Sequence, residues 1–376
     1  MSGFVRNHNN FDFIRFILAS FIILPHSVLL TGNELNTFFV LTKGQLEPGA
    51  FLVYLFFVVS GYLVVASYLR LNNTIKYLLF RALRIFPALI VAVFLTVFVI
   101  GPIVTTVSMH QYFTSENTYL YLNNIWLHMN YHLTGFDSHS PTIYNTLVNG
   151  SIWTLPIEFT CYLMIAVLGA LRLLNKYTVL LVGVIGISCS INFSILFHPA
   201  PNIFFHPWLW GIARHLFFPL EEFFQIMPYF FFGAYFNLNQ ENIVYNYKRS
   251  VIALIIIAIT IITGHGLNTV LPITGTYLLL HLAFNKRIKF QNFGKYGDFS
   301  YGIYLYGFLI QQLVIMYFNG KISYTLNYLM SFLIALVMGI VSYHYIEKPC
   351  MSLKRLVNKS KKIDTHSETS ALPFSY

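Results

Sequence analysis

Long apolar runs, separated by short polar segments, dominate the chain. A run of about 20 apolar residues is the length that an α-helix needs to cross the hydrocarbon core of a membrane. Ten such runs lie near residues 11–30, 49–69, 85–105, 152–171, 177–197, 223–237, 250–264, 268–284, 299–318 and 324–346. The pattern therefore predicts an all-α membrane protein, a single polytopic bundle of about ten transmembrane helices.

The composition excludes a water-soluble globular protein. Of the 376 residues, 56% are hydrophobic and only 10% are charged, whereas soluble domains carry about 25% charged residues. We therefore expect one membrane domain over residues 1–346. The basic polar tail, 347–376, is too short to form a separate domain. Two longer segments between apolar runs, 106–151 and 198–222, are expected to be large outer loops.

The positions of the cations predict the orientation of the bundle. Nineteen of the 23 lysines and arginines fall in segments that would share one side of the membrane. Three (Lys43, Arg214 and Lys321) fall on the other side, and Arg15 lies within the first run. Because cytoplasmic loops are enriched in lysine and arginine, both termini are predicted to be cytoplasmic.

The distribution of the cations also indicates which binding partners to expect. Short clusters of cations between apolar runs are typical of membrane topology, so no nucleic acid partner is expected. The basic residues of the tail, 354–362, are expected to face anionic membrane lipid.

Three ionisable residues lie inside predicted spans, where charge is costly and is by default a sign of function. Arg15 and His26 share one face of the first span, about 16 Å apart along its axis. Glu158 lies in the fourth span, at a depth that the sequence predicts to be similar to that of His26. A carboxylate beside an imidazole favours general-base catalysis. A structural His–Glu hydrogen bond between two helices is the alternative.

A second cluster of cations opens the third span. Arg81 and Arg84 are neighbours at spacing i, i+3 on one helix face. They are either anchors that set the topology or, together with Arg15, a binding site for an anionic ligand that enters from the cytoplasm. No metal site is expected, because His128 and His132 on the outer segment have helical spacing but no third ligand.

Six segments of the chain carry a resemblance to a known family. In chain order they are FDFIRFILASFIILPHS (11–27), FFVVSGYL (56–63), FRALRIFP (80–87), NGSIWTLPIEFTCYL (149–163), YGDFSYGIYLYGFLIQQ (296–312) and YIEKPCMSLKR (345–355). They resemble, in the same order, the motifs of the membrane acyltransferase-3 family. One departure is Gly307, which stands where family members often have a histidine; Tyr304 and Gln311 are candidates to replace it.

The resemblance implies an O-acyltransferase of the bacterial inner membrane, with acetyl-CoA as the acyl donor and a hydroxyl of a surface carbohydrate as the acceptor. O-antigen, capsule, exopolysaccharide, peptidoglycan and a small glycoside are all candidate acceptors, free or lipid-linked. A transporter or flippase that uses the intramembrane charges as a relay is the alternative function. The oligomeric state is left open.

The implied roles fall into three groups. His26 is expected to be the general base, supported by Glu158, or else to carry the acetyl group covalently. The remaining site residues are Arg15, Ser60, Arg81 and Arg84 for the donor, and Asn149, Trp153 and Tyr304 for the acceptor.

Overall fold

The computed structural model describes residues 9–33, 36–197 and 220–354. Throughout these ranges the chain forms helices joined by turns and loops, and no strand occurs in them. The all-α class predicted from the sequence is thereby confirmed. Most of the predicted outer loop 198–222, including Arg214, and the basic residues from 355 onward lie outside the described residues.

Each of the ten predicted ranges is helical. The helices are α1 (Phe11–Phe21) with α2 (Ile23–Leu30), α4 (Pro48–Leu71), α5 (Thr74–Leu95) with η1 (Thr96–Ile100) and α6 (Gly101–Val104), η3 (Gly150–Trp153) with α9 (Thr154–Ala170), α10 (Lys176–Phe197), α12 (Leu220–Leu238), α13 (Tyr247–Thr263), α14 (Leu267–Ala283), α15 (Ser300–Tyr317), and α16 (Tyr324–Ser342) with η5 (Tyr343–Glu347) and α17 (Lys348–Ser352). The last of these continues past the predicted end of the membrane domain at residue 346.

Among the described residues, five of these helices are long and apolar enough to cross a membrane: 11–30, 48–71, 74–104, 150–170 and 324–352. The side chains of α16 indicate which face of this helix is suited to lipid. One stripe of small and polar residues (Asn327, Ser331, Ala335, Gly339 and Ser342) is buried, while Leu333 and Val337 are about 60% exposed. Since apolar side chains face outward and polar ones inward, this surface is suited to lipid. The number of crossings and the cytoplasmic termini stay predictions.

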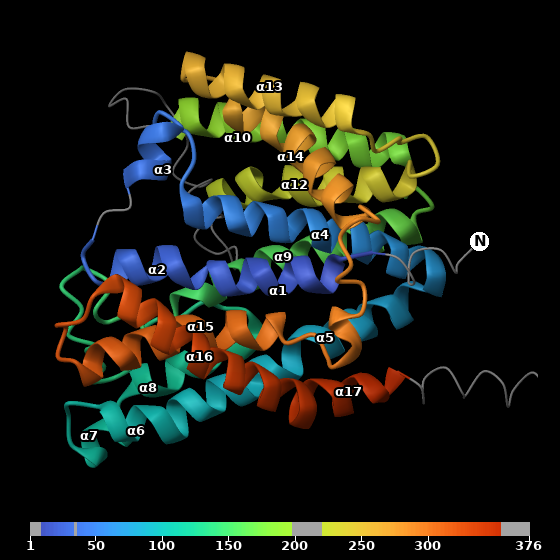
Figure 1. Ribbon diagram of the computed structural model, residues 1–376. Coiled ribbons are helices and arrows are strands. Elements are labelled where there is room, and N and C mark those ends of the chain that lie inside the picture. The colour runs from blue at the N-terminus through green and yellow to red at the C-terminus, as the bar shows by residue number, and fades with distance from the viewer. Residues whose placement is uncertain (1–8, 34–35, 198–219, 355–376) are drawn as a thin grey trace, which may run out of the picture.

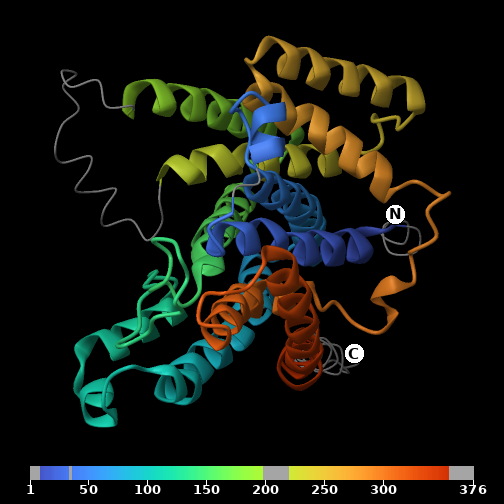
Figure 2. The ribbon, with the colours of Figure 1, turned by 60° about the vertical axis from the view of Figure 1, so that its left-hand side comes forward.

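The helices form two groups on either side of α1 and α4 (Figures 1 and 2). On one side lie α10, α12, α13 and α14, and on the other lie α5, α15 and α16, with α9 beside α4. The first turn of α1 and the whole of α17 lie at the same end of the bundle. The short helices α7 (Met109–Thr114) and α8 (Glu116–Leu120) lie at the opposite end.

Prolines account for the interruptions of three helices. Pro25 follows the break between α1 and α2 at Ile22, and Pro102 and Pro349 follow the π-helical turns η1 and η5. A proline lacks the N–H that the preceding turn would use, so the helix adjusts locally just before it. The turn η5 has a consequence for the site, because it ends at Glu347.

The segment before α9 enters the bundle. The side-chain amide of Asn149 donates to the Leu305 carbonyl at 2.8 Å, and Gln312 donates to the Tyr144 and Leu147 carbonyls at 2.7 and 2.6 Å. Leu305 lies twelve residues before the end of α15 at Tyr317, which corresponds to about 18 Å of helix. The fourth span therefore begins deep in the bundle and not at its surface.

The closest helix packing joins α4 and α12. A Cβ atom at Gly61 would overlap the Phe230 carbonyl oxygen, and one at Gly233 would overlap the Val58 carbonyl oxygen. The absence of side chains at both glycines lets the two backbones touch, as small residues do between membrane helices.

We predict that Gly61→Ala lowers the free energy of unfolding by about 1–3 kcal/mol, because the added methyl group must push two backbones apart. Thermal unfolding in detergent measures the effect. Gly49→Ala on the same helix is the control, since its nearest neighbour would be Pro25 at 3.8 Å. Equal melting temperatures for the two variants would contradict the close packing.

Candidate active site

Two adjoining cavities lie between α1, α4, α5, α9 and α15. The Tyr304 cavity is lined by Arg15, Val53, Phe56, Phe57, Ser60, Thr154, Leu155, Glu158, Ser300, Tyr301 and Tyr304. The Arg81 cavity is lined by Arg15, Phe56, Ser60, Leu63, Val64, Arg81, Arg84, Ile85, Glu158, Tyr162 and Tyr301. Five residues line both: Arg15, Phe56, Ser60, Glu158 and Tyr301. The two cavities therefore form one elongated space, apolar along much of its length and cationic at the Arg81 end.

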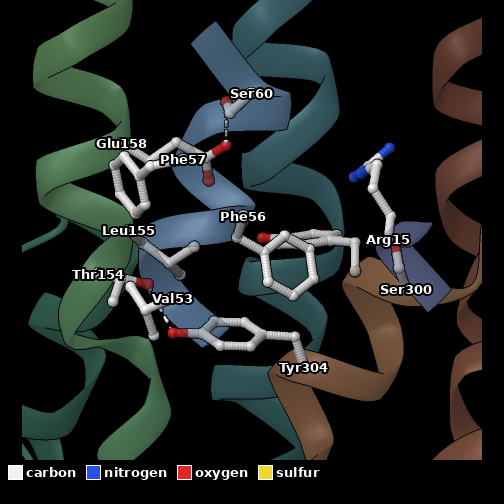
Figure 3. A pocket seen from close by; sticks show the side chains of 11 residues that line it. Arg15, Val53, Phe56, Phe57, Ser60, Thr154, Leu155, Glu158, Ser300 and Tyr304 are labelled. Carbon is white, nitrogen blue, oxygen red and sulfur yellow. Dashed lines mark hydrogen bonds between the residues drawn. The ribbon is translucent and has the colours of Figure 1, made fainter. Parts of the chain in front are cut away.

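Glu158 lies where the cavities meet. Its Oε1 atom accepts hydrogen bonds from the Ser60 hydroxyl at 3.0 Å and from the Tyr162 hydroxyl at 2.5 Å. Ser60 comes from α4, so this cluster joins two helices (Figure 3). The second oxygen of Glu158 has no protein partner among the described residues. The carboxylate is thus held firmly while part of it faces the space.

The predicted contact between His26 and Glu158 does not form. In the part of the chain that the structure describes, no hydrogen bond or ion pair joins them, and His26 lines neither cavity. The His26 ring instead packs edge-on against Phe308, with ring centroids 5.2 Å apart. Phe308 lies seven residues beyond Tyr301, which faces Glu158, so His26 stands roughly 10 Å further along the bundle.

The reason for this error is the start of α9. The sequence-based depth assumed that the span begins at the outer surface near Ile152. Because 150–153 begins instead beside Leu305, twelve residues before the end of α15 at Tyr317, every residue of α9 lies deeper than predicted.

Two of the three predicted donor arginines bind carboxylates. The Asp298 Oδ2 atom accepts from Arg15 and, at 2.6 Å, from Arg84. Arg84 also donates to Glu347 Oε2 at 3.0 Å. Burial raises the pKa of Asp298, but Arg15 and Arg84 lower it by more, so its pKa lies well below the ordinary value. Asp298 is therefore ionised at neutral pH.

Arg81 differs from its two neighbours. Within the described residues it forms no ion pair, and its Nε–H is buried without a hydrogen-bond partner. The guanidinium lies 5.7 Å from the Tyr162 ring centroid and makes a long hydrogen bond, 3.4 Å, to Ser67. Burial, and then repulsion from Arg81, Arg84 and Arg70, lowers the pKa of Lys354 to about 8. Arg81, which has no ion pair among the described residues, thus makes this end of the space cationic.

Of the three predicted acceptor residues, only Tyr304 lines a cavity. The Tyr304 hydroxyl lies in the cavity named after it, 2.6 Å from the Thr154 hydroxyl and 2.5 Å from the Ser151 carbonyl (Figure 3). Asn149 is buried, and its side chain binds the Leu305 carbonyl and the Ser151 backbone and hydroxyl. Asn149 and Trp153 do not line either cavity, so in this structure Tyr304 is the one of the three that faces the space.

Of the two candidates to replace the missing histidine, Gln311 is structural and Tyr304 faces the cavity. A side chain at Gly307 would contact Ile23, one turn from His26. The buried Gln311 donates to the Ile23 carbonyl at 2.7 Å and to the Ser27 hydroxyl at 2.6 Å. Gln311 thus fixes the backbone on both sides of His26.

Sequence reasoning missed Asp298, Glu347, Tyr162 and Thr154 as members of the site. Two of them had a usable signal. Asp298 and Glu347 lie inside the last two family-like motifs, and a carboxylate at the edge of a span requires a partner. For Tyr162 the only signal was its position four residues after Glu158, on the same helix face.

Comparison with known proteins identifies the family of this chain. Residues 8–344 match the acyltransferase-3 family profile, described as "Acyltransferase domain". An "O-acetyl transferase" of Shigella phage Sf6 is 28% identical over 90% of this chain and 95% of its own length. "Nodulation protein 10" of Rhizobium leguminosarum bv. viciae is 25% identical over 93% of this chain and 94% of its own length. No solved structure matches the chain significantly. With the family profile matched over nearly its whole length, the chain belongs to the acyltransferase-3 family of membrane acyltransferases.

Proposed function

We propose that this protein is an O-acetyltransferase of the bacterial inner membrane that moves acetyl from acetyl-CoA to a hydroxyl of a surface carbohydrate. The observation that carries the proposal is the elongated space with a cationic end at Arg81 and a polar, aromatic end at Tyr304. A relative named O-acetyl transferase, similar along nearly the whole chain, supports the same chemistry. Membership of an acyltransferase family argues against the transporter alternative.

The shape of the donor suits this space. Acetyl-CoA carries phosphates at one end and a thioester at the other, joined by an extended arm. Arg81 would pair with the phosphates, since an arginine fork matches phosphate oxygens and this one has no carboxylate among the described residues. The arm would lie past Ser60 and Glu158, whose polar atoms can bind its amides. The thioester would then reach the end lined by Tyr304 and Thr154.

The chemistry requires a base for the acceptor hydroxyl. In the proposal, the oxygen attacks the thioester carbonyl, the His26 imidazole takes the hydroxyl proton, the C–S bond breaks, and the CoA thiolate leaves and is protonated. An ester forms on the sugar. His26 packs against Phe308, which lies one turn beyond Tyr304 on α15. His26 is therefore nearer than Tyr304 to the end from which a carbohydrate would approach. A covalent acetyl–His26 intermediate is a variant of this route.

Glu158 has a different part in the proposal from the one that the sequence suggested. It holds the Ser60 and Tyr162 hydroxyls at the junction of the cavities. Its support of His26 would therefore be indirect, through the placement of the donor.

Surface glycans from cells with and without the gene test the proposal. O-acetyl groups on O-antigen, capsule or exopolysaccharide should disappear on deletion and return with the intact gene, as measured by proton NMR of the purified glycan. An unchanged acetyl content in every surface glycan would reject it.

The proposed direction of transfer makes a topological prediction. In a chain whose native cysteines (Cys161, Cys189 and Cys350) are replaced, a thiol reagent that cannot cross membranes should label Asn117→Cys in spheroplasts. It should label Asn292→Cys only after lysis. Both positions are exposed, and cation-poor 106–151 is predicted outside while cation-rich 285–295 is predicted inside. The reversed pattern would place the Tyr304 end toward the cytoplasm and reject delivery across the membrane.

A further inference from the structure

Two carboxylates lie behind the arginines of the site. Arg15 and Arg84 line the Arg81 cavity, whereas Asp298 and Glu347, which bind them, line neither cavity. The Glu347 side chain is 2% exposed, against 13% for Arg84, whereas Asp298 is about as exposed as Arg15, at 18% and 21%. The guanidinium groups thus stand between the space and their counter-ions, of which Glu347 is buried.

Local structure fixes Asp298. Its second oxygen, Oδ1, accepts from the backbone N–H of Ser300 at 3.2 Å and from the Ser300 hydroxyl, at the start of α15. The preceding Gly297 has φ +136°, and a Cβ there would overlap the Tyr343 ring. A conformation that favours glycine therefore turns the chain so that Asp298 meets Arg15 and Arg84.

Glu347 is fixed in the same manner. It ends the π-helical turn η5, and its second oxygen accepts from the Ser342 hydroxyl at 3.2 Å. Arg84, which it binds, also lies 5.6 Å from the Tyr301 ring centroid. Each carboxylate therefore has one oxygen held by its own segment and one directed at an arginine. Carboxylates held in this way orient the arginines and are poorly placed to swing aside when an anion arrives.

We infer that Asp298 and Glu347 are positioning residues for the acyl donor, which hold Arg15 and Arg84 as rigid hydrogen-bond donors in the cavity wall. The inference rests on the proposed function, because it takes the anion in the cavity to be the phosphate end of acetyl-CoA. An arginine uses one N–H for each carboxylate oxygen and keeps others for a second acceptor. A fixed guanidinium loses less entropy on binding than a mobile one.

Kinetics of the purified protein test the inference, with acetyl-CoA as donor and surface polysaccharide from the deletion strain as acceptor. For Asp298→Asn and for Glu347→Gln, the KM for acetyl-CoA should rise about tenfold, the range of one charge-assisted contact. The kcat should stay within about twofold, since the bond-making atoms lie at the other end of the space. Ser300→Ala, which keeps the charge of Asp298 and loosens it, should raise KM by about threefold.

Asp12→Asn is the matched control. Asp12 lies close enough to Asp298, Arg15 and Arg84 to interact with their charges, but it forms no ion pair among the described residues. Its removal should leave KM within about twofold, because only direct contacts position the arginines.

Four results would overturn the inference. An unchanged KM with a lower melting temperature in Asp298→Asn, Glu347→Gln and Ser300→Ala would make the cluster a lock between helices only. A lower KM would make the carboxylates competitors of the donor. Failure of the wild-type protein to bind radiolabelled acetyl-CoA in equilibrium dialysis would reject the proposed function together with the inference, whereas binding with equal affinity in wild type and variants would reject the inference alone.

Discussion

Replacement of His26 by alanine is expected to reduce acetyl transfer by at least about a hundredfold, the contribution of a positioned general base. The imidazole packs against Phe308, one turn beyond Tyr304 on α15, and Gln311 fixes the backbone around it. Transfer of radiolabelled acetyl from acetyl-CoA to the acceptor polysaccharide measures the loss. His26→Gln should be as inactive as His26→Ala, although it fills more of the space beside Phe308.

The control for His26 is His132→Ala. His132 is exposed on the segment 106–151, so its loss removes an imidazole without touching the cavities and should leave the rate unchanged. A well-folded His26→Ala protein that keeps more than a few per cent of wild-type activity would remove His26 from the chemistry.

Replacement of the two arginines of α5, Arg81 and Arg84, is expected to have different effects. Arg81→Gln should weaken acetyl-CoA binding about tenfold to a hundredfold and make the remaining affinity less sensitive to salt, because a charge that pairs with phosphate is lost. Arg84→Gln should in addition destabilise the protein by about 3–5 kcal/mol, because it leaves the buried Glu347 carboxylate without its ion pair. Equilibrium dialysis with labelled acetyl-CoA and thermal unfolding separate the two effects.

A different result is expected if Arg81 acts only as an anchor that sets the membrane topology. If Arg81 only sets the orientation of the third span, Arg81→Gln should lower the amount of inserted protein or disturb its orientation. Unchanged donor affinity in a correctly inserted Arg81→Gln protein would favour the anchor role and remove Arg81 from the donor site.

The helices could be predicted from the sequence because lipid-facing helices must be apolar along their whole length. The run at 324–346 was found for this reason, although the structure buries polar Asn327 and Ser331 inside it. Its exact end was not predictable, since α17 continues the helix through Pro349 by way of the π-helical turn η5. Apolar runs thus give the location of helices better than their ends.

The depth of Glu158 could not be read from the sequence. A depth estimate assumes that a span begins at the membrane surface, and the segment before α9 enters the bundle as far as Leu305. The entry depends on the hydrogen bonds of Asn149 and Gln312 to distant backbone atoms, which no local pattern encodes. The pairing of Glu158 with Ser60 and Tyr162 instead of His26 follows from it.

The arginines of the cluster could be predicted from the sequence, but their carboxylate partners could not. The sequence identifies Arg15, Arg81 and Arg84 as cations in or beside apolar runs. It does not show that two carboxylates more than two hundred residues later, Asp298 and Glu347, bind two of them. Only the folded chain distinguishes Arg81, which has no carboxylate among the described residues, from its neighbours.

Release of CoA by the purified protein tests the central claim most directly. Protein in detergent is mixed with acetyl-CoA and with surface polysaccharide from the deletion strain, and free thiol is measured together with acetyl bound to the polysaccharide. We predict that wild-type protein releases CoA and acetylates the polysaccharide in equal amounts, and that His26→Ala does neither. Folded wild-type protein that releases no CoA and leaves the polysaccharide unmodified would contradict the account.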